Sequence, residues 1–523
     1  MPVNARSRRF SRGALAGPPR SAWAAAARFG LAPLLRRTTG YAPAVCCAAL
    51  RAWLLGAALL NGACSTESRD LLERSRAAPS AMIAPSASAS ATFAVPAPIP
   101  EAVLPAVLPK LRVYIKNRYV FVRPRPDVNA DWLGFLWFGA SVELRSAEPV
   151  GGPGCKAFYA IEPNGFVCVD DKQATLSADD PIFKLVQRYA PKLDQPVPHR
   201  YAESLGAELL TQRPSAEGQW PTLPAFFHEP RRHLLPLSTL AYIEEQAIDG
   251  KPWLLSADLM WLKKAQVTLY PEITFHGVEL GKEFSLPLAF FRQPGSARFT
   301  RNAAGKFEKS RHSFELHEVV ALGKQIEIQR GERYFELASG GEWLRERDAV
   351  LPVPRSVTPW GAHVGSEDHT GRGPKNPRQT WLEVSVLGGW LLAFEGTKPV
   401  FATLISPGRG GIPQEGKNTL EIAATPLGTF PISGKLATVT MQAPGEYVHS
   451  DVPWTQNFQK PYAIHTAYWH DNWGNLQSGG CINVSPIDGK WLFDFTEPKL
   501  PAGWHAVRWQ PATGAPTLLV VHE

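Results

Sequence analysis

The chain has 523 residues and carries 55 Lys and Arg against 47 Asp and Glu, a formal charge of +8. The positive surplus lies in its first 64 residues, which hold nine Arg and no Lys, Asp or Glu; without these nine, 46 basic and 47 acidic residues remain, a charge of about −1. The bulk of the chain is therefore not basic, which removes the electrostatic argument for nucleic-acid binding. At about 150 residues per domain, the length is sufficient for two to four domains.

Residues 1–63 have the features of an export signal. Arg51 precedes an apolar run that ends at Leu60, which is too short to cross a bilayer but has the length of a signal-peptide core. Small residues then lead to Cys64, as in a bacterial lipobox, although Leu60 lies one position further from the cysteine than is usual. The pattern predicts lipidation of Cys64 and a membrane anchor, and secretion without a lipid is the alternative.

Residues 64–109 are dominated by Ala, Pro and Ser and show no periodicity. Such a composition cannot bury a core, so we expect a flexible, partly extended tether. A tether of this kind after an acylated cysteine would let a globular part reach away from the membrane.

Residues 110–175 have the pattern of a small β domain. Alternating runs such as VYIKNRYVFVRP and FLWFGASVELRS are separated by Pro-rich and Gly-rich breaks. The pattern resembles a bacterial SH3-like barrel. Cys155 and Cys168 lie within it; in an exported protein they are candidates for a disulfide, and two buried thiols are the alternative.

Residues 176–377 alternate short β-like runs with Pro and Gly breaks, which predicts a mostly β middle region. The segments 250–254 (GKPWL) and 341–344 (GEWL) are candidates for equivalent strands of one or two further SH3-like units. The histidines of this region lack ligand spacing, so we assign no chemistry to it. Residues 361–377 are expected to form a linker or an exposed loop.

Residues 378–523 form the last expected domain. The strands WLEVSVL and WLLAFE flank Gly388-Gly389, a two-residue hairpin signal. Near the end of the chain, Ser485-Pro486-Ile487-Asp488 has the form of a capping box with Pro at the first helical position, which predicts a short helix there.

The stretch from Tyr462 to Phe495 carries the chemistry. Cys481 follows two glycines, with His465 and His470 upstream. A thiol is a strong nucleophile only when a base or a lowered pKa frees its thiolate, and an imidazole is the usual partner. A buried, inert Cys481 is the bland alternative. A zinc site of the same three residues would lack an evident fourth ligand.

These residues resemble the L,D-transpeptidase (YkuD-type) family. Its signature is an upstream His, then Ser/Thr-His-Gly-Cys-hydrophobic-Asn, and the matching positions here are His465, Ser478, Gly480, Cys481, Ile482 and Asn483. Gly479 replaces the second His of the signature. Residues 425–430 (TPLGTF) match a further element of the family. The resemblance implies a mostly β chain: a YkuD-like β-sandwich with the Cys at the end of an internal strand and a short helix after it, preceded by SH3-like β-barrel modules.

The resemblance also implies roles for individual residues. Cys481 is the expected nucleophile toward peptidoglycan stem tetrapeptides, His465 the general base, and the carbonyl of Thr466 the group that orients the imidazole. The N–H groups of Gly480 and Cys481 are the candidates for the oxyanion hole. Ser478 and Asn483 are expected to fix the loop geometry, and Asn483 is also a candidate substrate contact. Tyr447 is a candidate lid residue or a packing residue, and His470 is a candidate substrate contact, a loop cap or a packing residue. The family uses no metal and no cofactor, so none is expected.

Together these features predict a peptidoglycan L,D-transpeptidase on the periplasmic side of the cell envelope, with stem peptides and a membrane as partners. The same acyl-enzyme would support L,D-carboxypeptidase or endopeptidase activity, or attachment of a protein to the wall. Because Gly479 departs from the signature, a wall-binding lipoprotein without activity is the alternative from another class.

Overall fold

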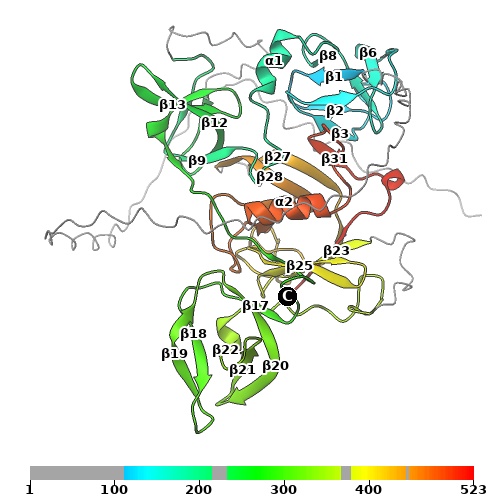
Figure 1. The fold of residues 1–523 in the computed structure, drawn as a ribbon. Coiled ribbons are helices and arrows are strands. Elements are labelled where there is room, and N and C mark those ends of the chain that lie inside the picture. Colours follow the sequence, from blue (N-terminus) through cyan, green and yellow to red (C-terminus); the bar gives the residue numbers. More distant parts are fainter. Residues whose placement is uncertain (1–110, 215–231, 367–378, 443–446) are drawn as a thin grey trace, which may run out of the picture. The chain divides into compact units, whose positions relative to one another are not determined.

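The computed structural model describes residues 111–214, 232–366, 379–442 and 447–523 (Figure 1). The predicted signal, the tether and the lipidation candidate Cys64 lie outside these residues. The described part is mostly β, as predicted, with two short α-helices, α1 (Pro181–Gln187) and α2 (Pro486–Phe495). Neither helix is long and apolar enough to cross a membrane.

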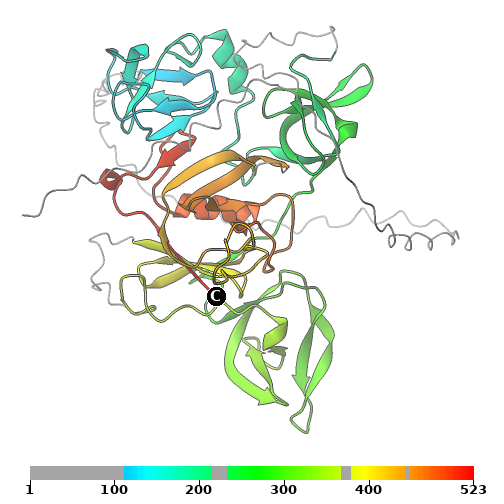
Figure 2. The same cartoon turned by 180° about the vertical axis from the view of Figure 1, so that it is seen from behind.

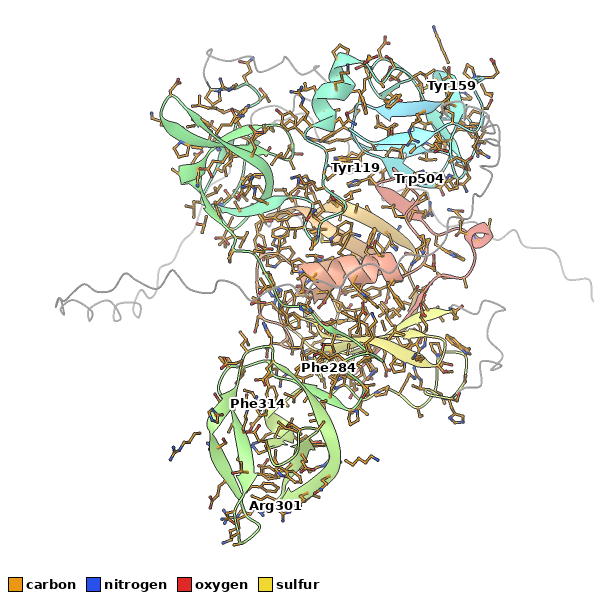
Figure 3. All side chains as sticks on the ribbon, in the orientation of Figure 1. Tyr119, Tyr159, Phe284, Arg301, Phe314 and Trp504 are labelled. Atoms are coloured by element: carbon orange, nitrogen blue, oxygen red, sulfur yellow. A yellow bond between two sulfur atoms is a disulfide. The ribbon has the colours of Figure 1, made fainter. Side chains whose placement is uncertain are left out.

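Residues 111–175 form small antiparallel sheets, one in the order β4-β1-β8 and one in the order β5-β6-β7, while β3 pairs with β31 (Ala506–Arg508) near the end of the chain. The strands are β1 (Arg112–Ile115), β2 (Val120–Val122), β3 (Gly134–Leu136), β4 (Ser141–Glu143), β5 (Val150–Gly152), β6 (Cys155–Ala160), β7 (Phe166–Cys168) and β8 (Ala174–Thr175). Trp504 closes their core, where its indole N–H donates to the carbonyl of Glu162 at 3.1 Å (Figure 3). Within the described residues the sheets do not close into a barrel, so the SH3-like assignment stays a prediction.

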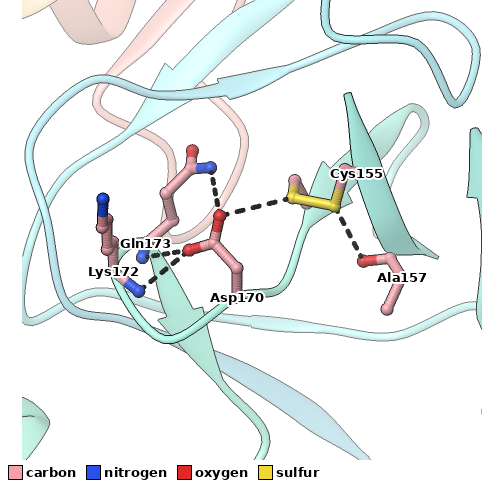
Figure 4. Close-up of a disulfide and its surroundings, with 6 residues drawn as sticks. Cys155, Ala157, Asp170, Lys172 and Gln173 are labelled. Atoms are coloured by element: carbon pink, nitrogen blue, oxygen red, sulfur yellow. Dashed lines mark hydrogen bonds between the residues drawn. A yellow bond between two sulfur atoms is a disulfide. The ribbon is translucent and has the colours of Figure 1, made fainter. Parts of the chain in front are cut away.

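Cys155 and Cys168 form a disulfide that links β6 to β7 (Figure 4). The turn that follows β7 is closed by Asp170, whose carboxylate accepts the backbone N–H groups of Lys172 and Gln173 at 2.9 and 2.8 Å. Of the two states that the sequence left open, the structure has the disulfide.

The middle region is mostly β, as predicted. Its elements after α1 are β9 (Arg200–Ser204), β10 (Glu208–Leu209), β11 (Arg232–His233), β12 (Thr239–Ile248), β13 (Lys251–Ser256), β14 (Trp261–Lys263), the 3-10 helix η3 (Lys264–Gln266), β15 (Val267–Leu269), β16 (Val278–Glu279), β17 (Leu288–Phe290), β18 (Ser296–Arg301), β19 (Phe307–Phe314), β20 (Val319–Gln329), β21 (Glu332–Leu337), β22 (Trp343–Arg345) and the 3-10 helix η4 (Glu346–Asp348). In the second half, β17 to β22 form one six-stranded sheet, whose core includes Phe314 stacked on Phe291 with ring centroids 3.7 Å apart (Figure 3).

The same unit occurs twice in this region. The hairpin β12–β13 turns at Asp249-Gly250, and the hairpin β20–β21 turns at Arg330-Gly331, with positive φ at both residues of each turn. A short strand beginning Trp-Leu and a 3-10 helix follow each hairpin, β14–η3 in one copy and β22–η4 in the other. The predicted equivalence of the segments 250–254 and 341–344 is therefore wrong by one strand, because the GEWL segment corresponds to β14 rather than to β13.

The C-terminal part packs two sheets around one core. Its remaining elements are β23 (Thr380–Ser385), β24 (Trp390–Glu395), β25 (Lys398–Leu404), β26 (Gly428–Pro431), β27 (Gly434–Gln442), β28 (Val448–Gln459), β29 (Tyr462–Thr466), β30 (Ile482–Val484), the 3-10 helix η5 (Pro511–Thr513) and β32 (Leu518–His522). One sheet has the order β16-β25-β24-β23-β32-β26, and the other contains β27, β28, β29 and β30. Apolar side chains of both sheets, such as Val384 and Ile464, form one buried cluster with Leu492 of α2. Figures 1 and 2 show α2 between β27–β28 and the β23–β25 strands.

Helix α2 begins as the sequence predicts, with Ser485 as N-cap and Pro486 at the first position. The hydroxyl of Ser485 accepts the N–H of Asp488 at 3.2 Å. The Asp488 carboxylate does not complete the capping box; it accepts the backbone N–H of Gly277 at 2.8 Å and the hydroxyl of Thr403. Asp488 is 1% exposed, and burial raises its pKa to about 6.

The burial of this carboxyl group predicts that Asp488→Asn increases the stability of the fold in a pH-dependent way. Because the pKa of Asp488 is higher in the folded state than its ordinary value of 3.8, the carboxyl costs little below pH 4 and destabilises the fold as the pH rises through about 6. An amide can still accept the N–H of Gly277 and can donate to the hydroxyl of Thr403, so we expect the variant to be more stable by about 3 kcal/mol at pH 8 and unchanged at pH 4. Urea unfolding at both pH values measures this, with Asp494→Asn, exposed on the same helix, as control. An equal effect of Asp488→Asn at both pH values would contradict the assignment.

Candidate active site

The parallel pairing of β29 and β30 builds the site. Its register sets His465 opposite Asn483 and Thr466 opposite Val484. Every residue of both strands is buried, so the backbone that carries these side chains is fixed from both faces. Cys481 is the residue immediately before β30 and is partly exposed.

A chain of hydrogen bonds orients His465. Its Nδ1 lies 3.1 Å from the carbonyl oxygen of Thr466, and its Nε2 lies 3.0 Å from Nδ2 of Asn483. A carbonyl can only accept, so Nδ1 carries the proton and Nε2 accepts from the amide. His465 therefore presents the lone pair of a neutral imidazole on Nε2.

His470 orients Asn483 in turn. The backbone N–H of Asn472 donates to Nδ1 of His470 at 3.3 Å, so Nε2 of His470 carries the proton and donates to Oδ1 of Asn483, also at 3.3 Å. Both the oxygen and the nitrogen of the Asn483 amide are thus used in this chain of hydrogen bonds. This arrangement favours a positioning role for His470 over substrate contact.

Burial keeps both reactive groups neutral. His465 is 4% exposed, and desolvation lowers its pKa to about 4. Desolvation also raises the pKa of the Cys481 thiol above its ordinary value, although a hydrogen bond from the backbone of Ala463 acts in the opposite direction. At neutral pH the cavity is therefore lined by a neutral thiol and a neutral imidazole rather than by a preformed thiolate–imidazolium pair.

The loop before Cys481 is tied down by Ser478. Its hydroxyl donates to the carbonyl of Cys481 at 2.5 Å and accepts the N–H of Gly480 at 3.0 Å. The Gly480 N–H thus already donates within the loop, and its place in the oxyanion hole stays a prediction. In the described part of the chain, the N–H groups of Gly479 and Cys481 take part in no hydrogen bond, so these two are the donors that remain.

Cys481 and His465 open on one cavity of about 330 Å³. Its walls also include three other predicted site residues and a set that the sequence did not indicate; the lining is Glu203, Leu237, Tyr270, Arg409, Met441, Tyr447, His449, His465, Trp469, Gln477, Ser478, Gly479, Cys481 and Asn483. A neutral base, a thiol and backbone donors on one cavity can carry out acyl transfer.

Comparison with known families agrees with this chemistry. Residues 379–503 match the family model described as the L,D-transpeptidase catalytic domain, YkuD. These residues are a YkuD L,D-transpeptidase catalytic domain. The match confirms the predicted family for this part of the chain.

Several solved structures are similar to part of the chain. An L,D-transpeptidase from Xylanimonas cellulosilytica is 21% identical, covering 28% of this chain and 63% of that one, with a TM-score of 0.21. A Cys-to-Ser mutant of the Enterococcus faecium L,D-transpeptidase is 22% identical over 28% and 50% of the two chains, with a TM-score of 0.20. An L,D-transpeptidase from Mycobacterium smegmatis is 14% identical over 49% and 90%, with a TM-score of 0.21. The chain thus covers less than two thirds of the first two. No curated protein matches the chain.

Within the YkuD domain, the predicted residues fall into two groups. Cys481, His465, Ser478, Tyr447 and Asn483 line the cavity, and Tyr447 is 42% exposed there. The remaining three, Thr466, Gly480 and His470, do not line it and support the others from behind.

Sequence reasoning missed a second imidazole. His449 stacks on Trp469 with ring centroids 4.0 Å apart, and its Nδ1 lies 3.4 Å from the hydroxyl of Thr239. Burial lowers its pKa to about 4, so it too is neutral at physiological pH. No local signal marks it, because His449 lies on β28, outside the signature.

Gly479, which replaces the second His of the family signature, lies where the structure has room for a side chain. A Cβ placed on Gly479 would meet no atom within 4 Å, and the φ of Gly479 is not positive, so packing does not require glycine there.

The zinc alternative has no geometric support, because in the described part of the chain no three His, Cys, Asp or Glu side chains come together as a metal site.

Proposed function

We propose that this protein is a peptidoglycan L,D-transpeptidase that forms an acyl-enzyme on Cys481. The observation that carries the proposal is the shared cavity of Cys481 and a neutral His465 whose Nε2 lone pair is oriented by Asn483. Export through the N-terminal signal, with Cys64 as lipid anchor, belongs to the same proposal, since stem peptides lie outside the cytoplasm.

In the first step Sγ of Cys481 attacks the carbonyl of the third residue of a stem tetrapeptide. The thiol proton passes to Nε2 of His465, which requires the hydrogen bond from Asn483 to give way. The N–H groups of Cys481 and Gly479 are the available donors to the oxyanion. The C–N bond to D-alanine then breaks, His465 returns the proton to the leaving amine, and a thioester remains.

In the second step the side-chain amine of another stem attacks the thioester. His465 takes a proton from this amine, the C–S bond breaks, and the thiolate of Cys481 recovers the proton. The product is a cross-link between two stems. Attack by water instead of the amine gives a trimmed tripeptide by the same route.

Intact-mass spectrometry with a stem tetrapeptide tests the proposal. We expect a mass gain equal to the donor less D-alanine, and no gain for Cys481→Ala. Adding a second stem should convert the adduct into a cross-linked dimer, whereas release of tripeptide alone would assign the protein as a carboxypeptidase. If wild type forms no adduct while iodoacetamide still alkylates Cys481, the enzyme assignment fails and a wall-binding role replaces it.

A further inference from the structure

Part of the cavity wall lies outside the YkuD domain. Glu203 on β9, Leu237 before β12 and Tyr270 after β15 line the same cavity as Cys481. These residues belong to the middle region, to which the sequence assigned no chemistry. The cavity is therefore incomplete without the β9–β15 segment, defined here as residues 200–214 and 232–270.

This wall is built into the catalytic sheet. Strand β12 pairs in parallel with β28 at Thr239 and His449. The ring of Tyr201 stacks on Tyr468 with centroids 3.5 Å apart, and its hydroxyl donates to the carbonyl of Asp451 at 2.9 Å. Both tyrosines are buried, so the segment is held in a defined position beside the cavity.

Glu203 supplies a negative charge on this wall. The phenol of Tyr270 donates to Oε2 of Glu203 at 3.0 Å, and burial together with this carboxylate raises the pKa of Tyr270, so the phenol stays protonated. Among the described residues, no hydrogen bond or ion pair involves Oε1 of Glu203, and no cation is paired with the carboxylate. A half-buried carboxylate with one oxygen held and one oxygen open is suited to a cationic ligand.

We propose that the β9–β15 segment is part of the active site and that Glu203, positioned by Tyr270, binds a cationic amine of the substrate. The inference rests on the proposed function. The attacked carbonyl belongs to the diamino acid at the third position of the stem, so the side chain of that residue has to enter the cavity together with the carbonyl. Glu203 then selects donors whose third residue carries a free side-chain amine.

The test compares two tetrapeptide donors that differ only in that amine, present in one and absent in the other. Single-turnover acylation of Cys481 is followed by intact mass for wild type and Glu203→Gln. Since a hydrogen bond to a charged group contributes about ten- to a hundredfold in binding, wild type should prefer the amine-bearing donor by that factor in the rate at low donor concentration. Glu203→Gln, which keeps the bond from Tyr270, should bring the ratio close to one.

Two controls separate folding and function from recognition. Glu245→Gln changes an exposed carboxylate on β12 that does not line the cavity and should leave the donor ratio as in wild type. Alkylation of Cys481 by uncharged iodoacetamide should be equal in all three proteins, which shows an intact site. An unchanged ratio in Glu203→Gln overturns the inference and leaves the transpeptidase proposal standing. Absence of acylation by either donor in wild type overturns the proposed function itself, and with it the inference.

Discussion

Replacing Gly480 by alanine is expected to lower the rate of acyl-enzyme formation on the order of a hundredfold, whereas alanine at Gly479 should change it by less than about threefold. Gly480 has a φ of +124°, and a Cβ there would lie 2.6 Å from the ring of Tyr462 and 2.9 Å from the carbonyl oxygen of Ala424. The backbone carbonyl cannot move aside, so the loop has to shift and carry Cys481 with it. A Cβ placed at Gly479 has no atom within 4 Å.

The two variants form a matched pair, because they make the same chemical change at adjacent positions. Acylation by a stem tetrapeptide, followed by intact mass, gives the rates, and circular dichroism checks that both proteins fold. Gly479→His, which restores the family signature, should also fold, since a Cβ at this position meets no atom within 4 Å. Equal losses at both glycines would show that the loop around Cys481 is not held as the structure has it.

The meeting of His465 and Cys481 at one cavity could be predicted from the sequence because its signal is local. His465 and Cys481 belong to one short signature, and the parallel register of β29 and β30 needs only the loop between them. The start of α2 was predictable for the same reason, since Ser485 and Pro486 act on their immediate neighbours. Such local signals can be interpreted without knowledge of the rest of the fold.

The partners of these residues could not be predicted, because they depend on packing between distant segments. Glu203 and Tyr270 reach the cavity only through the pairing of β12 with β28. The hydrogen bond from Gly480 to Ser478 uses a donor that the pattern alone made available for the oxyanion hole. Asp488 satisfies the capping pattern, yet its carboxylate accepts a hydrogen bond from the backbone N–H of Gly277, a residue 211 positions away.

The internal repeat was detected in the wrong register for a related reason. Trp253 and Trp343 both precede Leu, but they lie on different strands of the repeated unit. The glycines at the hairpin turns, Gly250 and Gly331, mark the correct alignment. Turn residues were the better guide here, because they require positive φ while a Trp-Leu pair only requires burial.

Acylation by wild type is expected to be independent of pH between about 5 and 8 and to fall below that range with an apparent pKa near 4, the value to which burial lowers His465. The sign follows from the lone pair: as the pH falls through the pKa, Nε2 gains a proton and can no longer accept one from Cys481. Because the pKa of the thiol is raised, the acidic limb should belong to the base and not to the nucleophile. His449 has the same lowered pKa, so His449→Gln serves as control and should keep the acidic limb.

His465→Gln should lower the acylation rate at pH 7 on the order of a thousandfold, within the usual range for a general base. Iodoacetamide alkylation separates this loss from damage to the thiol. Alkylation depends on the thiolate, so in wild type its rate at the Cys481 peptide should rise about tenfold per pH unit from pH 6 to beyond 8, with no plateau in the acid range. A plateau near pH 6 that disappears in His465→Gln would mean that an ion pair exists before substrate binds. In that case proton transfer would precede the attack, and the neutral pair inferred from the burial of His465 and Cys481 would be wrong.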